Sequence, residues 1–151
     1  MNSIEVRQAF LADLDDLSKL FDEYRQFYGK SSDLGLAKEF LRARFNHGES
    51  TLFVAHAGSA AVGFVQLYPS FSSVSAERTY ILNDLYVRPE ARRTGVASQL
   101  LAAAEHYAQE LGAIRLTLST AISNESAQLL YASAGWKRDE QFMVFHRAVQ
   151  A

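Results

Sequence analysis

Residues 82–101 decide the fold class of this chain, and they read L-N-D-L-Y-V-R-P-E-A-R-R-T-G-V-A-S-Q-L-L. A hydrophobic strand pattern leads into a turn rich in arginine, and an amphipathic helix follows at once. The start of a helix leaves about four backbone N–H groups without partners and carries the positive end of the helix dipole. Gly95 lets the backbone approach a ligand, and Arg88, Arg92 and Arg93 add guanidinium groups. The turn predicts a phosphate site, with a solvated loop and an ordinary helix cap as the alternative.

The hydrophobic pattern on either side alternates between strand and helix periods. After the helix that begins near residue 96 and stops at Gly112, we expect a strand over residues 114–118, a helix from Ser123 or Asn124 to Ala134, and a final strand over residues 142–149. Before it we expect strands over residues 4–10, 51–56, 61–68 and 78–87, helices over residues 13–28 and 36–45, and a serine-rich loop over residues 70–76. The sequence therefore predicts an α/β (α+β) fold, one domain over residues 1–151, whose mixed sheet has about six to seven strands flanked by about four helices.

Composition and charge exclude several classes of protein. The chain has 151 residues, of which 48% are hydrophobic and 21% charged, as expected of one globular domain. A net charge of −2 argues against a dedicated nucleic-acid binder. The absence of cysteine excludes a thiolate nucleophile, and the four histidines lack metal-site spacing. No apolar run reaches the roughly 18–20 residues of a membrane span, and residues 1–10 lack a signal-peptide core, so we expect a cytoplasmic protein with no membrane partner.

Two motifs resemble those of the GNAT superfamily of N-acetyltransferases. The first, R-x-x-G-x-A at residues 92–97, follows a strand ending in L-Y-V-R-P-E at residues 85–90. The second, N-E-S-A-Q-L-L-Y-A-S-A-G-W at residues 124–136, is similar to the family's N-x-x-A-x-x-L-Y-x-x-x-G-[FW]. Because their order, their spacing and the predicted elements also match, the resemblance covers nearly the whole chain. It implies acetyl-CoA as cofactor and a primary amine as acceptor, either a small molecule, an amino acid or a protein lysine.

The resemblance also implies which residues hold the cofactor. The backbone of Leu85, Tyr86 and Val87 would pair with the pantetheine arm. Asn124 would contact the cofactor near its pantetheine amides, and Tyr131 would point its hydroxyl at the sulfur. The pyrophosphate would be held by the loop and the first helical turn, which comprise Arg92, Arg93, Thr94, Gly95, Val96, Ala97 and Ser98.

Aminolysis of a thioester needs an acid for the leaving thiolate and an acceptor for the proton of the amine. A phenol has a reference pKa of about 10, close to that of an alkyl thiol, so Tyr131 is the candidate acid, with a core-facing tyrosine as the alternative. Asp84 is the carboxylate nearest to the loop and the candidate base; the alternative is a strand carboxylate tied to backbone or arginine. Asn83 stands where the superfamily's polyamine acetyltransferases have glutamate, which argues against a polyamine acceptor. The candidate acceptor-binding residues are Tyr24, Tyr28, Tyr80 and Asn83.

Other functions remain open from the sequence. The first alternative is a non-catalytic acyl-CoA-binding or sensing module on the same fold, because fold alone does not fix function. The second is nucleic-acid binding through the arginine cluster, which the net charge disfavours. With no cysteine to carry an acetyl group, an enzyme of this kind would transfer it directly in a ternary complex. The family often pairs through edge strands or helices, so the resemblance also allows a homodimer.

Overall fold

The computed structural model describes residues 3–150, and the chain divides after Ser119 into two compact units. The first unit contains β1 (Ile4–Gln8), α1 (Leu14–Phe27), α2 (Leu34–His47), β2 (Thr51–Ala57), β3 (Ala60–Ser72), β4 (Glu77–Val87), α3 (Val96–Glu110) and β5 (Leu116–Thr117). The strands lie in the order β1-β2-β3-β4-β5, antiparallel except for the parallel pair β4–β5. The predicted α+β class with a mixed sheet is confirmed, but the sheet of the described residues has five strands, fewer than expected. None of the helices in residues 3–150 has the length and apolar character that a bilayer crossing requires.

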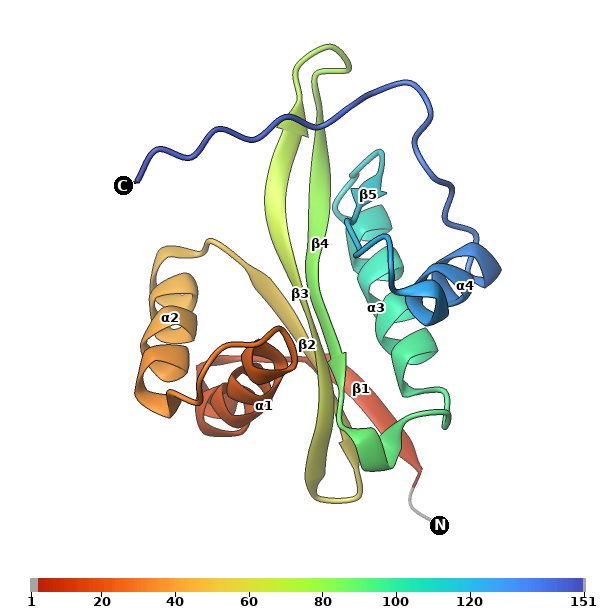
Figure 1. Cartoon of the computed structure of the whole chain (residues 1–151). Coiled ribbons are helices and arrows are strands. Elements are labelled where there is room, and N and C mark those ends of the chain that lie inside the picture. The colour runs from red at the N-terminus through yellow and green to blue at the C-terminus, as the bar shows by residue number, and fades with distance from the viewer. Residues whose placement is uncertain (1–2, 151) are drawn as a thin grey trace. The chain divides into compact units, whose positions relative to one another are not determined.

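Helices cover both faces of the sheet in the first unit (Figure 1). On one face α1 packs on α2 and on β3, where Leu17 and Phe64 are fully buried. On the other face α3 crosses β1 to β4 and packs tightly on Gly63. A Cβ at Gly63 would stand 2.9 Å from the Tyr86 carbonyl oxygen and 3.3 Å from Val96 Cγ1. A glycine is therefore needed at residue 63 to let the helix and the neighbouring strand approach.

β4 carries a bulge at Asn83. Gln66 of β3 pairs with Asp84, but the next residue, Leu67, pairs with Leu82. Asn83 is thus one extra residue on β4, left without a partner in the register. Because side chains alternate between the two faces of a strand, an inserted residue exchanges the faces on which the following side chains lie.

The bulge gives the two halves of β4 different neighbours. Before it, Tyr80 packs edge-on against Tyr107 of α3, with 5.7 Å between ring centroids. After it, Asp84 and Tyr86 face α1, where the Tyr86 ring lies 6.2 Å from that of Tyr24. An unbroken strand would place residues 80, 84 and 86 on one face. The bulge therefore brings the candidate base to the face covered by α1 and leaves Tyr80 on the other.

The prediction of a loop over residues 70–76 is wrong in part. β3 continues through Pro69 to Ser72, and it forms with β4 a long hairpin whose tip projects beyond the other strands (Figure 1). The sequence predicts that Pro69 ends the strand, because proline has no N–H to donate. However, β2 reaches only to Thr51, opposite Leu67. Beyond that point β3 is an edge strand, where proline is tolerated.

The second unit contains α4 (Glu125–Ser133). Asn124 caps this helix, because its Oδ1 accepts a hydrogen bond of 3.1 Å from the Ala127 N–H. The strand predicted over residues 142–149 is not formed, since residues 134–150 have neither helix nor strand. Their own unit offers no second strand with which to pair, and a lone strand leaves its backbone groups unsatisfied. In the first unit the strand predicted over residues 114–118 is reduced to the two residues of β5.

Gly63→Ala should lower the free energy of unfolding by about 1–3 kcal/mol, the usual cost of overpacking a well-filled core. The control is Gly35→Ala in α2, where a Cβ meets only Asp33 Oδ1 at an ordinary 3.8 Å and φ is not positive. That change should be neutral or stabilising, because alanine loses less backbone entropy than glycine on entering a helix. Urea unfolding of both variants measures the difference, and equal effects would contradict the close approach at Gly63.

Candidate active site

The loop before α3 forms a cradle of backbone N–H groups. Arg93 has φ of +63° and Gly95 has φ of +86°, so two residues of the loop adopt the left-handed backbone conformation. Within residues 3–150, the N–H groups from Arg93 to Ser98 donate no hydrogen bonds, and the first bond of α3 runs from the Gln99 N–H to the Gly95 carbonyl. Unpartnered N–H groups at a helix start, with the positive end of its dipole, are suited to an anionic phosphate. The residues fit the pyrophosphate of a coenzyme A thioester.

The outer edge of β4 is open next to this cradle. β5 pairs only with Tyr80 and Ile81, so no strand of the described residues pairs with that edge at Leu85 or Tyr86. Arg92 donates from Nε to the Val87 carbonyl at 2.9 Å. Its guanidinium lies over the ring of Phe27 in α1 and the ring of Tyr86 in β4. The Nε bond leaves the two terminal nitrogens of Arg92 for an anion. An extended polar ligand can therefore add to the strand edge and reach the cradle.

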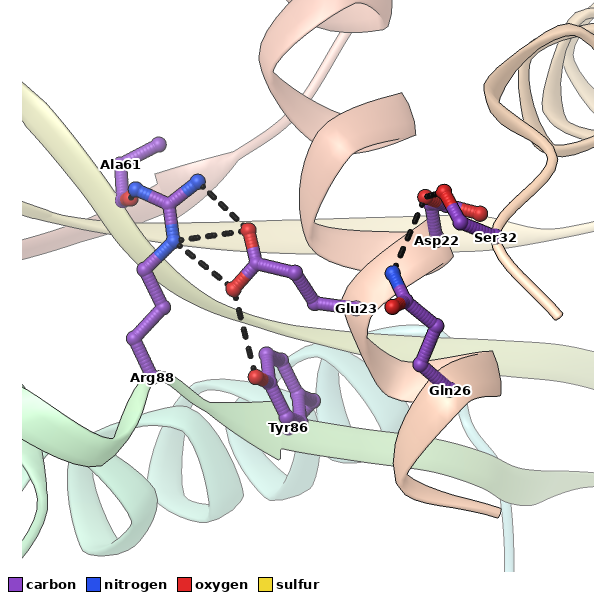
Figure 2. Close-up of polar contacts among 7 residues, drawn as sticks. All are labelled: Asp22, Glu23, Gln26, Ser32, Ala61, Tyr86 and Arg88. Carbon is purple, nitrogen blue, oxygen red and sulfur yellow. Dashed lines mark hydrogen bonds and ion pairs between the residues drawn. The ribbon is translucent and has the colours of Figure 1, made fainter. Parts of the chain in front are cut away.

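Arg88 does not join the cradle (Figure 2). It forms a two-pronged ion pair with Glu23 of α1, with 2.9 Å between Arg88 Nη2 and Glu23 Oε2. Its Nη1 donates to the Ala61 carbonyl at 2.9 Å, and the Tyr86 hydroxyl donates to Glu23 at 3.3 Å. The phosphate role that the sequence suggested for Arg88 is thus replaced by a structural one. Its guanidinium ties α1 to the ends of β3 and β4, just before the cradle.

Asp84 is a buried carboxylate with no counter-cation among the described residues. It is only 3% exposed, and no lysine or arginine among residues 3–150 forms an ion pair with it. Gln66 Nε2 donates to Oδ2 at 2.5 Å, Asn83 Nδ2 donates to Oδ1 at 3.1 Å, and the Tyr24 hydroxyl is directed at the same carboxylate. Burial raises the pKa of Asp84 above its ordinary value, and these donors partly offset the rise. The Asp84 carboxylate therefore binds a proton more readily than an ordinary aspartate does.

Aromatic side chains surround this carboxylate on the α1 side. Burial and the charge of Asp84 raise the pKa of the Tyr24 hydroxyl well above its usual range, and they raise that of Tyr68 to about 12. Tyr28 packs edge-on against Tyr24 but is itself 58% exposed. The structure therefore brings Tyr24 and Asn83 to Asp84, places Tyr28 one ring further out, and puts Tyr80 on the opposite face of the sheet.

The connection between α1 and α2 is held by Asp22 (Figure 2). Its carboxylate accepts hydrogen bonds from Gln26 Nε2 at 3.2 Å, from Ser32 Oγ at 2.7 Å and from the Asp33 N–H at 2.8 Å. Asp33 in turn caps α2 by accepting from the Leu36 N–H. Each hydrogen bond to the buried Asp22 among the described residues comes from a neutral donor of α1 or of the connection that follows it. Asp22 therefore has a structural role at the end of α1 that carries the tyrosines.

In the second unit, α4 carries the other two predicted residues. Asn124 uses its side-chain oxygen as the helix cap, so its NH₂ group is the part that remains for a ligand. The Tyr131 ring lies 6.1 Å from that of Trp136, and the Tyr131 carbonyl accepts a 3.0 Å hydrogen bond from the Trp136 N–H. The motif glycine, Gly135, has φ of +93°, a conformation that other residues rarely adopt. The second motif thus forms a capped helix closed by a turn onto a tryptophan.

Three residues of the site were missed by sequence reasoning. Gln66 lies in the strand A-V-G-F-V-Q-L at residues 61–67, where one polar side chain among apolar ones is a signal of a buried hydrogen bond. Tyr68 follows two positions later and shares its face. Glu23 gives no comparable signal, because a carboxylate on an amphipathic helix usually faces solvent.

Comparison with known proteins identifies the class. The sequence model of the Acetyltransferase (GNAT) family matches residues 14–136. The uncharacterized N-acetyltransferase YhfO of Bacillus subtilis is 45% identical over 140 residues, which are 93% of this chain and 94% of that protein. A crystal structure of a probable acetyltransferase superposes with a TM-score of 0.92 at 42% identity, covering 97% of this chain and 99% of that one. The thialysine N-ε-acetyltransferase of Bos taurus is 27% identical over 146 residues, 89% of this chain and 85% of that protein.

The fold and the named relatives thus define an acyltransferase. The chain belongs to the GNAT acetyltransferase family.

Asp84→Asn should stabilise the protein at neutral pH. Because the pKa of Asp84 is raised on folding, the folded state binds the proton more tightly than the unfolded chain. Ionised Asp84 therefore lowers the free energy of unfolding, and its cost develops as pH rises from the unfolded pKa of about 3.9 through the folded one. The gain from the substitution should be larger at pH 7 than at pH 4 in urea unfolding.

The control for this prediction is Asp13→Asn, which should have the opposite sign. The hydrogen-bonded ion pair with Arg7, at 2.7 Å, holds the pKa of Asp13 below its ordinary value. Its stabilising contribution is present above the unfolded pKa and is lost as pH falls through the folded one. If both substitutions destabilise the protein at pH 7, the assignment of Asp84 as a costly buried charge is contradicted.

Proposed function

We propose that the protein transfers the acetyl group of acetyl-CoA to a small primary amine, by direct attack of the amine on the thioester in a ternary complex. The GNAT family uses acetyl-CoA, and relatives of this chain are named for the acetylation of thialysine and aminoglycosides. The observation that carries the proposal is the buried Asp84 carboxylate, which has no cation of the described chain beside it. A buried charge is normally paired, and an ammonium substrate would supply the missing partner.

The cofactor half of the site is proposed on the open edge of β4 and the cradle before α3. The backbone of Leu85, Tyr86 and Val87 would pair with the pantetheine amides, as an added strand does. The pyrophosphate would accept hydrogen bonds from the N–H groups that follow Arg92, with the terminal nitrogens of that arginine as further donors. The residues proposed for the pyrophosphate remain Arg92, Arg93, Thr94, Gly95, Val96, Ala97 and Ser98. The family motif supports an added contact from the NH₂ group of Asn124.

The acceptor half is proposed on the α1 side of the sheet. Tyr24 and Asn83 hold Asp84, and Tyr68 with Tyr28 would provide the aromatic wall beside an incoming ammonium. The faces of aromatic rings attract cations, so this wall favours an amine over an alcohol. Tyr80 is not retained in this group, because it packs on α3.

The proposed reaction takes two protons from the ammonium and gives one to the leaving thiolate. Acetyl-CoA supplies an acyl group activated as a thioester. Asp84 accepts a proton from the ammonium, so an N–H bond breaks, an O–H bond forms and the nitrogen keeps the electron pair with which it attacks. The new C–N bond forms as the C–S bond breaks, and the leaving thiolate takes a proton from the hydroxyl of Tyr131. The attacking nitrogen loses its second N–H proton as the amide forms, and this proton restores the Tyr131 hydroxyl. The backbone N–H of Val87 would stabilise the negative charge that develops on the carbonyl oxygen, because the register with β3 turns the Tyr86 N–H toward β3 and that of Val87 toward the open edge.

The experiment that tests this function measures CoA release with acetyl-CoA and a panel of primary amines, including thialysine, lysine, amino sugars and a lysine-bearing peptide. A thiol reagent reports CoA without background, since the chain has no cysteine. We expect steady turnover with at least one amine and an N-acetylated product of matching mass. Binding of acetyl-CoA without turnover on any amine would contradict the transferase proposal and favour an acyl-CoA sensor.

Gly95→Glu should abolish binding of acetyl-CoA, because it adds a carboxylate at the cradle and strains a φ of +86°. The matched control is Gly48→Glu at the end of α2, where φ is +62° and a Cβ also meets nothing within 4 Å. Both variants add the same charge at a glycine with positive φ. Only Gly95→Glu places that charge beside the proposed pyrophosphate. Calorimetric titration with acetyl-CoA should give at least a 100-fold weaker dissociation constant for Gly95→Glu. Equal affinities would refute the cradle.

A further inference from the structure

Gln66 is a polar side chain buried in the middle of an apolar strand. It is fully buried, as are its neighbours Val65 and Leu67. Its Nε2 donates to Asp84 Oδ2 at 2.5 Å, while its Oε1 is buried without a hydrogen-bond partner among residues 3–150. Burying an amide with half of its hydrogen-bonding capacity unused is costly, so this side chain needs an explanation beyond packing.

The groups around Asp84 favour one protonation state. Gln66, Asn83 and Tyr24 all act as donors toward the carboxylate, which suits its ionised form. The other titratable group facing it is Tyr68 of β3, on which Arg44 of α2 also acts. The Glu23–Arg88 pair bonds to the Tyr86 hydroxyl and to the Ala61 carbonyl, and no contact of it with Asp84 is found among the described residues. A protonated Asp84 needs an acceptor for its new O–H group. Of the neighbouring oxygens that could accept, Gln66 Oε1 is buried without a hydrogen-bond partner among the described residues.

We propose that Gln66 is a positioning residue that serves both protonation states of Asp84. Its Nε2 holds the ionised carboxylate, and after rotation of the amide by about 180° its Oε1 accepts the hydrogen bond of the protonated carboxyl. The inference rests on the proposed function, in which Asp84 takes a proton from the ammonium once in every turnover. The unpartnered Oε1 is the acceptor that the protonated state uses. When the product leaves, the proton returns to water and the amide rotates back.

The proposal distinguishes Gln66 from a residue that only fills space. A filler would affect stability but would leave the titration of Asp84 alone. A positioning residue sets that titration, because a hydrogen bond to a charged group is worth enough to move a pKa by about one to two units.

The test uses Gln66→Met, which keeps the volume and removes both polar atoms. The variant loses both the donor of the ionised state and the acceptor of the protonated state. Because a hydrogen bond to a charged group is worth more than one between neutral groups, the pKa of the Asp84 carboxyl and the acidic limb of the pH profile of kcat/KM should both still rise by about one pH unit. Carbon-13 NMR of labelled aspartate, assigned with Asp84→Asn, follows the carboxyl without any substrate. The Gln66 side-chain amide signals of the unmodified protein should titrate together with that carboxyl.

Two further variants complete the design. Gln66→Glu is nearly isosteric, and it should raise the carboxyl pKa further, because two carboxyls in contact share one proton. It also keeps the test available if Gln66→Met does not fold. Gln26→Met is the matched control, since Gln26 also donates to an aspartate, Asp22, on the same unit. It should move neither the carboxyl titration nor the pH profile.

The outcomes separate this inference from the proposed function. If the carboxyl titration and the acidic limb are the same in Gln66→Met or Gln66→Glu as in the unmodified protein, Gln66 is a structural residue and the inference is overturned. If no amine is acetylated by the unmodified protein, the proposed function fails. In that case the carboxyl titration still decides whether Gln66 controls the protonation of Asp84.

Discussion

The single extra residue in β4 is the constraint on which the rest of the site depends. Asn83 lies between pairs that would otherwise be continuous, and it turns Asp84 and Tyr86 toward α1 while Tyr80 stays against α3. Without it, the candidate base would share a face with Tyr80 and lie under α3. The bulge residue also contributes a hydrogen bond to the carboxylate that it redirects. Asn83 thus both turns Asp84 toward α1 and donates a hydrogen bond to its carboxylate.

Two further contacts hold the acceptor face and the cofactor cradle near each other. The Glu23–Arg88 pair joins α1 to the end of β4, and Arg92 folds the following loop back onto the Val87 carbonyl. Both arginines fix backbone before the helix, so the N–H groups of the cradle are oriented before a ligand arrives. Preorganised donors lose little entropy on binding an anion. Arg88 thus has a structural role, while the terminal nitrogens of Arg92 are the ones left for the proposed pyrophosphate.

Much of this could be predicted from the sequence, because local signals are strong where the chain must turn. The sequence of residues 82–101 predicts a strand, a cradle and a helix, and the structure has all three. The second motif predicts a capped helix ending before Gly135, which is also found. These are elements whose hydrogen bonds lie within a few residues of each other.

The remaining features depend on partners distant in the chain. Residues 142–149 have a strand pattern but no strand beside them in their own unit. Pro69 would end β3 only if a strand beside it needed an N–H donor at that position. β2 does not extend that far, because its pairing with β3 stops at Thr51, opposite Leu67. Arg88 resembles a phosphate ligand until Glu23, 65 residues away, is placed against it. A bulge has almost no sequence signal, so the sequence does not predict that Tyr80 and Asp84 face opposite sides of the sheet.

The most direct measurement is a nuclear Overhauser spectrum of the aromatic side chains, because it reads the two faces of β4 in one experiment. We expect contacts between the rings of Tyr80 and Tyr107 and between the rings of Tyr86 and Tyr24, with none between the two sets. Contacts from Tyr80 and Tyr86 to the same helix would mean that the strand is not turned over at Asn83. Asp84 would then not face α1, and the acceptor site built on it would be wrong.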